Sequence, residues 1–569
     1  MPPTTKLTVR QFFGRKGLLS EWHPNYEFRE GQLKMAEAIE SALADKRHLI
    51  VEAGTGTGKT LAYLVPAILS GRRVVISTGT KNLQEQLYFK DIPFLEKHLG
   101  PLRACYMKGR TNYACRQKIY DAEKEPVLTG LEEVADFQII REWEKTTQTG
   151  DRAEIRQLPE NSGAWAKVDA RAESCTGQKC VQFERCFITQ MHMKANESDI
   201  IIVNHHLFFA DLNVKGDERG AIIPDYSAVV FDEAHEVEDT AGQYFGVGAS
   251  SGQIEDLARD TAAVANRKEF NNGELDRVLI TLGDKSAQFF ALFGDKFNAP
   301  DGRSAFRAQD AFLEQHEEEY RNVLYALEIL ALQLELTKSA PDETLLLMAR
   351  ARDLIKRLEF WMEARDKRYV YWIEKRGRRT FLQATPIDVS GMLDERLFDV
   401  VDTVVLTSAT LAVAGEFEYT KQRLGLRNAR TEIVESHFDH HAQALLYVPQ
   451  HLPDPRKQAF TAAAALEIVE LLDLSKGRAF VLFTSYQQMR LIYDRVSLEI
   501  PYQTFLQGTA PRSALLDEFR KTPNAVLFAT SSFWQGVDVA GRPVELRDYR
   551  QTAVRSAERS GGGGSHRGH

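Results

Sequence analysis

Residues 48–65 read HLIVEAGTGTGKTLAYLV, and this stretch decides the fold of the first half of the chain. Its apolar start predicts a short buried strand, its middle is a glycine-rich loop, and its apolar end predicts a helix. In such a loop, small residues let consecutive backbone N–H groups surround phosphate oxygens, a lysine reaches the β- and γ-phosphates, and a hydroxyl binds Mg²⁺. A plain glycine turn is the alternative, because Ala53 stands where the generic pattern begins with glycine. The predicted phosphate-binding residues are Gly54, Thr55, Gly56, Thr57, Gly58, Lys59 and Thr60, of which Thr60 would bind Mg²⁺.

A second segment, residues 227–235 (SAVVFDEAH), is another apolar strand that ends in acidic residues. Asp232 would hold the Mg²⁺ shell, directly or through water, and Glu233 would polarise the water that attacks the γ-phosphate. Two carboxylates at a strand tip can also act only as a cap of the backbone. Together with the glycine loop they predict a site that binds and hydrolyses ATP, with Lys59, Asp232 and Glu233 as catalytic residues.

With these two segments the chain resembles a superfamily 2 helicase, in which further motifs follow in a set order, and that order is kept. Residues 74–80 with 82–87 are similar to motif Ia, whose strand-end hydroxyls and amides contact the DNA backbone. Residues 404–411 (VVLTSATL) are similar to motif III. Ser and Thr at strand ends also cap neighbouring backbone, which is the alternative for both segments. Upstream, the resemblance implies that Gln32 reads adenine.

The cysteines are unevenly placed, at Cys105, Cys115, Cys175, Cys180 and Cys186. The last four form one distant and three clustered thiols between the two nucleotide segments, and four thiolates can hold an iron–sulfur cluster. A four-cysteine zinc site is the alternative, because softness and ligand count do not separate zinc from iron and sulfide.

The cysteine arrangement, together with residues 201–208 (IIVNHHLF), resembles the DinG and YoaA branch of the XPD-like DNA helicases. The resemblance implies a [4Fe-4S] cluster on Cys115, Cys175, Cys180 and Cys186, and leaves Cys105 as an ordinary buried thiol. His205 and His206 are adjacent at the end of a strand and would point in opposite directions, so we expect packing or DNA-backbone contact rather than metal binding.

The expected fold class is α/β, with two RecA-like P-loop motor domains of which the second is incomplete. Between about 236 and 388 the pattern changes to long amphipathic helices, and this insertion has the place of the family's Arch domain. Residues 369–374 and 380–384 predict a hairpin with a basic turn that is solvated or touches phosphate. The expected domains are 1–104, 200–240 and 387–412 for the first motor domain, 105–199 for the cluster domain, 241–386 for the Arch-like insertion, 413–544 for the second motor domain and 545–569 for a non-native disordered tail.

The second motor domain is predicted from buried-strand patterns at 479–486 and 525–530. Residues 531–541 resemble motif V, in which Gln535 and Asp538 would face the nucleotide cleft. The family's motif VI is missing, and we expect no strand after Arg542. Synonymous codons for residues 546–560 can be chosen so that the same DNA, read one nucleotide later, encodes CVIIDKLPFAVPSDP. That sequence resembles what the DinG branch carries after motif V. We therefore expect a frameshift near residue 545.

Composition limits the classes of protein that remain. With 43% hydrophobic and 27% charged residues the chain is an ordinary folded protein, and its net charge of -8 means that any DNA site must be a local patch. No apolar run approaches the ~18 residues of a membrane-spanning helix, and the start has no apolar core of a secretory signal. These features indicate the cytoplasm and no membrane partner.

The resemblance implies an ATP-dependent DNA helicase that moves 5′ to 3′ on single-stranded DNA and unwinds tailed duplexes in DNA repair or replication. It implies ATP, Mg²⁺ and a [4Fe-4S] cluster as cofactors, a monomer, and single-strand DNA-binding protein as a neighbour. One alternative is an ATP- and DNA-binding fragment that does not unwind DNA, because motif VI is missing. The other is an RNA helicase whose cysteines form a structural zinc module.

Overall fold

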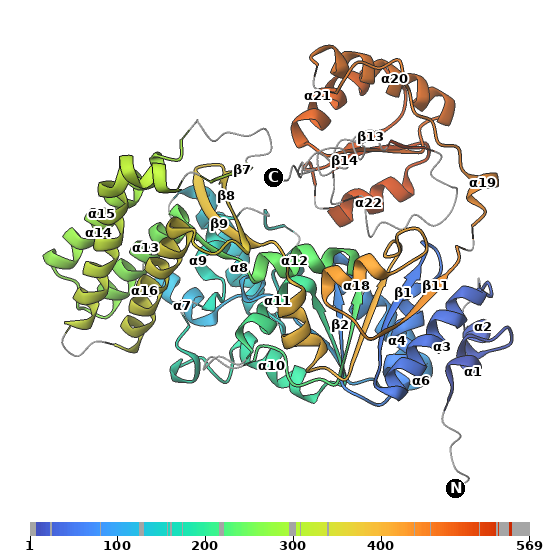
Figure 1. Ribbon diagram of the computed structural model, residues 1–569, viewed down its shortest axis with the longest axis horizontal. Helices are drawn as coiled ribbons and strands as arrows, with labels where there is room; N and C mark the ends of the chain where they lie inside the picture. Colours follow the sequence, from blue (N-terminus) through green and yellow to red (C-terminus); the bar gives the residue numbers. More distant parts are fainter. Residues whose placement is uncertain are drawn as a thin grey trace, which may run out of the picture. The chain divides into compact units, whose positions relative to one another are not determined.

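The computed structural model describes residues 7–22, 26–79, 81–124, 130–155, 157–159, 162–172, 175–215, 221–294, 303–307, 309–337, 341–436, 438–455, 457–510, 512–530, 533 and 546–548. The chain divides into two compact units, Met1–Phe438 and Asp439–His569, and each is described by itself (Figure 1). None of the helices within the described ranges is long and apolar enough to cross a membrane.

The first unit is built on a seven-stranded sheet in the order β11-β1-β10-β5-β2-β4-β3. Every neighbouring pair is parallel, so the carboxyl ends of the strands share one edge, which is where ligands bind to such sheets. The strands are β1 (His48–Ala53), β2 (Val74–Thr78), β3 (Ala104–Tyr106), β4 (Ile200–Asn204), β5 (Ala228–Asp232), β10 (Thr403–Ser408) and β11 (Ala429–Val434).

Helices cover both faces of this sheet, and alternate strand residues pack against them. In β1, Leu49 and Val51 pack in one core, whereas Ile50 between them belongs to the core on the other face. Because both faces are covered, the strands are apolar without alternation, which is typical of parallel sheets. The first face carries α1 (Val9–Phe13), α2 (Leu18–Trp22), α3 (Glu30–Asp45), α4 (Lys59–Leu69) and α6 (Ile92–Leu99), and the second carries α11 (His205–Val214), α12 (Val237–Tyr244) and α18 (Glu418–Leu424).

Between β3 and β4 the chain forms a small helical unit, residues 107–197, called the cysteine module below. Its core contains Phe137, Ile140, Trp165 and Phe187, all buried. The chain leaves the sheet at β3 and returns to it at β4, so the module is attached to the sheet by two neighbouring strands. Its helices are α7 (Arg116–Lys124), α8 (Leu131–Glu144), α9 (Gly163–Val168) and α10 (Phe187–Glu197), with short 3₁₀ turns that include η2 (Arg110–Asn112), η3 (Arg152–Glu154) and η5 (Gly177–Lys179).

The insertion after α12 is a helical bundle that packs on a small antiparallel sheet (Figure 1). Its helices are α13 (Ser251–Arg267), α14 (Gly273–Ala291), α15 (Gln309–Glu335) and α16 (Asp342–Glu363), and its sheet has the order β6-β9-β8-β7. Sequence periodicity predicts the helices and the β8–β9 hairpin but not the edge strands β6 and β7. The strands are β6 (Val247–Ser250), β7 (Arg303–Ala305), β8 (Tyr369–Arg376) and β9 (Arg379–Pro386).

The predicted basic turn of that hairpin is shorter than expected. Lys375 and Arg376 end β8, Arg379 begins β9, and the turn itself is Gly377 and Arg378. Gly377 has a φ of 60°, a left-handed conformation that glycine adopts without steric cost.

The second unit contains a four-stranded parallel sheet in the order β13-β14-β12-β15, with apolar cores on both faces. The expectation that no strand follows Arg542 is wrong, because Leu546–Asp548 forms β15 and pairs with β12. The strands are β12 (Ala479–Phe483), β13 (Thr504–Leu506) and β14 (Val526–Thr530), and the helices are α19 (His440–Gln443), α20 (Ala459–Ser475), α21 (Tyr486–Val496) and α22 (Arg512–Lys521).

Candidate nucleotide site and cysteine cluster

The glycine loop follows β1 at the carboxyl edge of the large sheet, and its conformation requires glycine. Gly56 and Gly58 have φ values of 81° and 82°, in the left-handed region. A Cβ on Gly56 would lie 2.1 Å from the Phe438 ring, and one on Gly58 would lie 2.3 Å from Gln32 Nε2. Within the loop, Thr57 Oγ1 donates to the Gly54 carbonyl at 2.7 Å.

Two side chains from the start of α3 hold the loop from outside. Arg29 donates to the Gly56 carbonyl at 2.5 Å, and Gln32 Nε2 donates to the Gly58 carbonyl at 3.0 Å. With its carbonyls occupied in this way, the loop can direct its N–H groups to an anion, and α4 begins at Lys59 directly behind it. Gln32 thus has a structural role in the loop, and its predicted reading of adenine stays a prediction.

The acidic pair lies beside the loop, because β5 and β1 are separated in the sheet by β10 alone. Lys59 Nζ is 3.7 Å from Glu233 Oε1. Asp232 is buried and accepts a hydrogen bond of 3.0 Å from the Tyr63 hydroxyl. Burial, reinforced by the charge of Glu233 and opposed by Lys59, raises the pKa of Asp232 to about 6. A divalent cation in contact with Asp232 would favour its ionised form.

Glu233 itself stands in a left-handed conformation, with φ 56° and ψ 46°, which is costly for a residue with a side chain. Its Oε2 accepts from Ser408 Oγ at 3.4 Å, and His235 Nδ1 lies 2.8 Å from the same hydroxyl. Ser408 ends β10, so the motif III segment contacts the acidic turn directly.

The structure also shows where other predicted residues lie. The motif Ia residue Gln84 is buried and donates to the Met107 and Ile202 carbonyls at 2.6 and 3.0 Å, so its amide is used inside the protein and not at a DNA surface. Gln535 and Asp538 lie outside the described residues. Tyr63 is a site residue that motif spacing does not predict, although its position four residues after Lys59, on the same face of α4, is a usable indication.

The four cysteines of the predicted cluster lie in the cysteine module, and none of them forms a disulfide. Cys115 precedes α7, Cys180 follows η5 and Cys186 precedes α10. Burial raises the pKa of the Cys115 thiol, and Cys186 and Cys180 add to the rise while Lys118 opposes it. Cys115 and Cys186 also pack against the same small apolar patch. Within the described ranges no three His, Cys, Asp or Glu side chains converge as around a single metal ion.

The chemistry of these donors fits an iron–sulfur cluster. The set consists of thiols, and their ionised forms are the ligands that such clusters use. Lys118 lies close enough to Cys115 to influence its titration, so a cation is present to offset thiolate charge. Cys105 is buried in the core of the first unit at β3, away from this set, as expected of a structural thiol.

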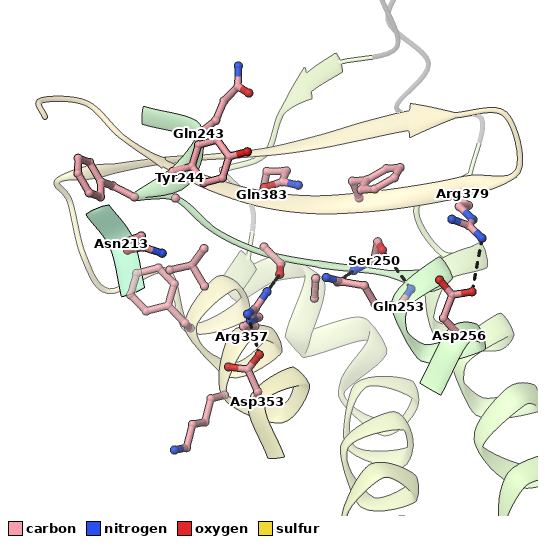
Figure 2. Close-up of a pocket in the computed structure, with 18 residues that line it drawn as sticks. Asn213, Gln243, Tyr244, Ser250, Gln253, Asp256, Asp353, Arg357, Arg379 and Gln383 are labelled. Atoms are coloured by element: carbon pink, nitrogen blue, oxygen red, sulfur yellow. Dashed lines mark hydrogen bonds and ion pairs between the residues drawn. The ribbon is translucent and has the colours of Figure 1, made fainter. Parts of the chain in front are cut away.

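A cavity of about 750 Å³ opens at the root of the helical insertion, between β6, α16 and β9 (Figure 2). Its basic residues are Lys356, Arg357 and Arg379, and its aromatic residues include Tyr244 and Phe381. Acidic partners restrain two of the basic residues. Arg357 pairs with Asp353 at 2.7 Å, and Arg379 lies 3.7 Å from Asp256.

Comparisons with known proteins show which chains this one is similar to. Residues 33–150 match the family of DEAD/DEAH box helicases, and residues 468–546 match the helicase C-terminal domain. The chain is 34% identical over 539 residues to the ATP-dependent DNA helicase YoaA of Haemophilus influenzae, covering 95% of this chain and 84% of the relative. It is 34% identical over 541 residues to YoaA of Escherichia coli, covering 94% and 83%. It is 30% identical over 551 residues to the ATP-dependent helicase DinG of Mycobacterium tuberculosis, covering 91% and 80%. A solved XPD helicase aligns over 89% of this chain and 80% of its own, at 16% identity and a TM-score of 0.48.

Proposed function

Because the chain belongs to the YoaA and DinG family of XPD-like superfamily 2 helicases, we propose that it is an ATP-dependent DNA helicase that moves 5′ to 3′ on single-stranded DNA and unwinds tailed duplexes. The observation that carries the proposal is the approach of Lys59 to Glu233, 3.7 Å apart, beside the buried Asp232 at the edge of the sheet. A lysine and two carboxylates in this arrangement supply what phosphoryl transfer to water requires.

Each residue of the site has a distinct task in hydrolysis. Lys59 neutralises charge on the γ-phosphate, and the loop from Gly54 to Gly58 orients the phosphates through backbone N–H groups. Glu233 orients the attacking water and accepts its proton. Mg²⁺, when bound by Thr60 and Asp232, offsets the negative charge that develops on the phosphate oxygens.

DNA binding is proposed for the cavity at the root of the helical insertion, because Ser77, Thr78 and Gln84 of the motif Ia segment and Ser408 of the motif III segment are buried. Lys356, Arg357 and Arg379 would contact phosphates, and Tyr244 and Phe381 would stack with bases. This local patch agrees with a chain whose overall charge is -8. Single-strand DNA-binding protein is proposed as a neighbour on the same strand.

A [4Fe-4S] cluster is proposed on Cys115, Cys175, Cys180 and Cys186. Cys186 and Cys180 both add to the raised pKa of Cys115, and Cys115 and Cys186 share a packing patch, which supports the assignment. When bound, the cluster would join the loops that carry the thiols and so stabilise the cysteine module. Four-cysteine zinc remains the competing assignment, and metal analysis separates the two.

The decisive experiment measures ATP hydrolysis by the full chain with and without single-stranded DNA, followed by strand separation on duplexes with either a 5′ or a 3′ tail. We expect DNA-stimulated turnover of ~1 to 100 s⁻¹ and separation of the 5′-tailed duplex. Glu233→Gln should lower turnover by ~10² to 10⁴ while ATP still binds. Hydrolysis that DNA does not stimulate, or a preference for the 3′ tail, would overturn the proposal.

A further inference from the structure

A buried histidine lies between strand β2 and the turn that carries Glu233. His205 is the first residue of α11 and is only 1% exposed. Its Nδ1 lies 2.7 Å from Ser77 Oγ, and its ring lies 5.7 Å from the Phe231 ring. The next residue, His206, is exposed, so the two adjacent imidazoles have different surroundings.

Strand register explains how His205 reaches the acidic turn. Ser77 in β2 is paired with Val203 in β4 on one side and with Phe231 in β5 on the other. His205 comes two residues after Val203, and Asp232 comes one residue after Phe231. The imidazole therefore lies across the end of β2, between the ends of its two neighbours.

The backbone of the acidic turn lies close enough to the His205 imidazole to act on its pKa. Nε2 is buried and makes no hydrogen bond of good geometry with the described part of the chain. Burial lowers the pKa of His205 to about 3, although the backbone of Asp232 and Glu233 acts in the opposite direction. The ring is therefore neutral near pH 7 and carries one N–H. The backbone of Asp232 and Glu233 favours a hydrogen-bond donor on the imidazole. We therefore assign the proton to Nε2, so that Nδ1 accepts a hydrogen bond from the Ser77 hydroxyl.

The acidic turn near His205 is strained. A left-handed conformation costs a residue such as Glu233 roughly 1–2 kcal/mol and persists only where the surroundings hold it in place. The Glu233 carboxylate is 3.4 Å from Ser408 Oγ and 3.7 Å from Lys59 Nζ. The Glu233 backbone is also held by the N–H of Glu236, which donates to its carbonyl at 3.0 Å, and by Asp232 Oδ1, which accepts from its N–H at 3.0 Å. His205 lies near the same backbone, which acts on the pKa of its imidazole.

We propose that His205 is a positioning residue for ATP hydrolysis, which supports the Glu233 turn from inside the sheet and connects it to Ser77 at the end of β2. The inference rests on the proposed role of Glu233 and extends it, because β2 is the first part of the motif Ia segment. A movement of the end of β2 is then transmitted to the Glu233 carboxylate through the His205 side chain. His205 touches no substrate, so its effect appears in turnover and not in the affinity for ATP.

Replacing His205 by Asn or by Gln tests the two ring nitrogens separately, because each amide side chain can replace only one of them. In His205→Asn the amide nitrogen takes the place of Nδ1 near Ser77, and nothing reaches the acidic turn. In His205→Gln the longer side chain puts its amide nitrogen near the place of Nε2. We expect His205→Asn to lower kcat for ATP about 10- to 100-fold, and His205→Gln to recover most of that loss. The KM for ATP should change less than about twofold in both, as expected when binding is untouched.

Two further variants complete the test. Ser77→Ala removes the hydroxyl that fixes the tautomer, so kcat and its stimulation by single-stranded DNA should both fall while KM is kept. His206→Asn, a matched change on the neighbouring exposed imidazole, should keep the DNA-free rate. Thermal melting and binding of a fluorescent ATP analogue show that each variant is folded. If His205→Asn does not fold, His205→Gln and Ser77→Ala carry the test.

The outcomes separate this inference from the proposed function. A folded His205→Asn with unchanged kcat, or equal kcat losses in His205→Asn and His205→Gln, would show that the residue only fills the core. If Glu233→Gln leaves turnover unchanged, the assignment of the hydrolytic residue fails instead. A normal effect of Glu233→Gln together with an unaffected His205→Asn overturns the positioning role alone.

Discussion

The Lys108 ammonium lies 2.6 Å from the Asp151 carboxylate, and each side chain is only 3% exposed. The same ammonium is 2.7 Å from Glu85, and the Tyr106 hydroxyl donates to Asp151 at 2.9 Å. Glu85 belongs to α5 (Lys81–Gln86), Tyr106 to β3, and Asp151 to the cysteine module. Lys108 and Asp151 both lie in the cysteine module, and their contacts with Glu85 and Tyr106 connect the module to the motor domain at the segment that resembles motif Ia.

Removing one partner of the Lys108–Asp151 pair should lower the stability of the folded protein. Lys108→Met leaves the Asp151 carboxylate buried without its cation, which typically costs about 3–5 kcal/mol. We expect a lower free energy of unfolding in urea and earlier cleavage of the cysteine module by a protease. The matched control is Arg103→Met, which breaks the exposed pair with Asp199 and should cost less than about 1 kcal/mol. Equal losses in the two variants would contradict the role assigned to Lys108.

A second prediction concerns Asp91, whose carboxyl has one buried oxygen. Asp91 ends the short π-helix η1 (Leu87–Asp91), and its Oδ2 is buried without a hydrogen bond from the described residues. Burial raises the pKa of Asp91 from 3.8 to about 6, with Lys90 opposing. The folded protein therefore holds this proton more tightly than the unfolded chain does, and the ionised side chain destabilises the fold as the pH rises from about 4 to about 6.

Asp91→Asn should remove that penalty. Its free energy of unfolding should exceed that of the wild type by up to about 3 kcal/mol above pH 6, and the difference should vanish near pH 4. A control of opposite sign is Asp366→Asn, because Arg368 lowers the pKa of Asp366. That variant should be less stable at neutral pH and approach the wild type as the pH falls. Urea unfolding across this pH range measures both, and an Asp91→Asn difference that does not depend on pH would contradict the prediction.

The phosphate loop gives a third prediction. Gly56→Ala and Gly58→Ala each put a side chain into the left-handed region and against a neighbour, the Phe438 ring or Gln32. The backbone cost of roughly 1–2 kcal/mol alone corresponds to about a tenfold weaker binding of ATP. The control is Gly283→Ala on the exposed face of α14, where an added Cβ meets nothing within 4 Å. It should keep ATP binding and gain about 0.5–1 kcal/mol of stability.

The cysteines give a fourth prediction. The purified protein should be brown and contain about four iron atoms per chain, and Cys115→Ala should lose the visible absorbance and most of the iron. Cys105→Ala, a change to a buried thiol outside the cluster, should keep both. A colourless wild type with about one zinc per chain would support the zinc alternative.

Local sequence patterns predicted much of the fold. A short apolar run that is bounded by glycine or by an acidic residue indicates a buried strand whatever the surrounding sequence is. The strands at 48–52, 228–232 and 404–408 are confirmed, as is the hairpin of β8 and β9. Edge strands such as β6 are short and mixed in polarity, so no periodic pattern marks them. The strand β15 has a charged centre and was missed for the same reason.

The site was harder to predict, because its partners are far apart in sequence. Motif spacing indicates Lys59 and Glu233, but nothing in the sequence around Gln84 shows that its amide turns inward to Met107 and Ile202. The contact of His205 with Ser77 depends on strand order, which places β4 beside β2. A single sequence does not specify which strands become neighbours, so this contact could not be predicted from it.

The position of β1 in the sheet sets the order in which the protein can be assembled on the ribosome. The neighbours of β1 are β10 and β11, which begin at residues 403 and 429. At a synthesis rate of about 5–20 residues per second, β11 begins to appear roughly 20 to 75 seconds after β1. The cysteine module and the helical bundle have cores of their own and emerge within that interval. The nascent chain can thus complete its two insertions before the sheet that joins them closes, and the phosphate loop is among the last sites to form although it is encoded near the beginning.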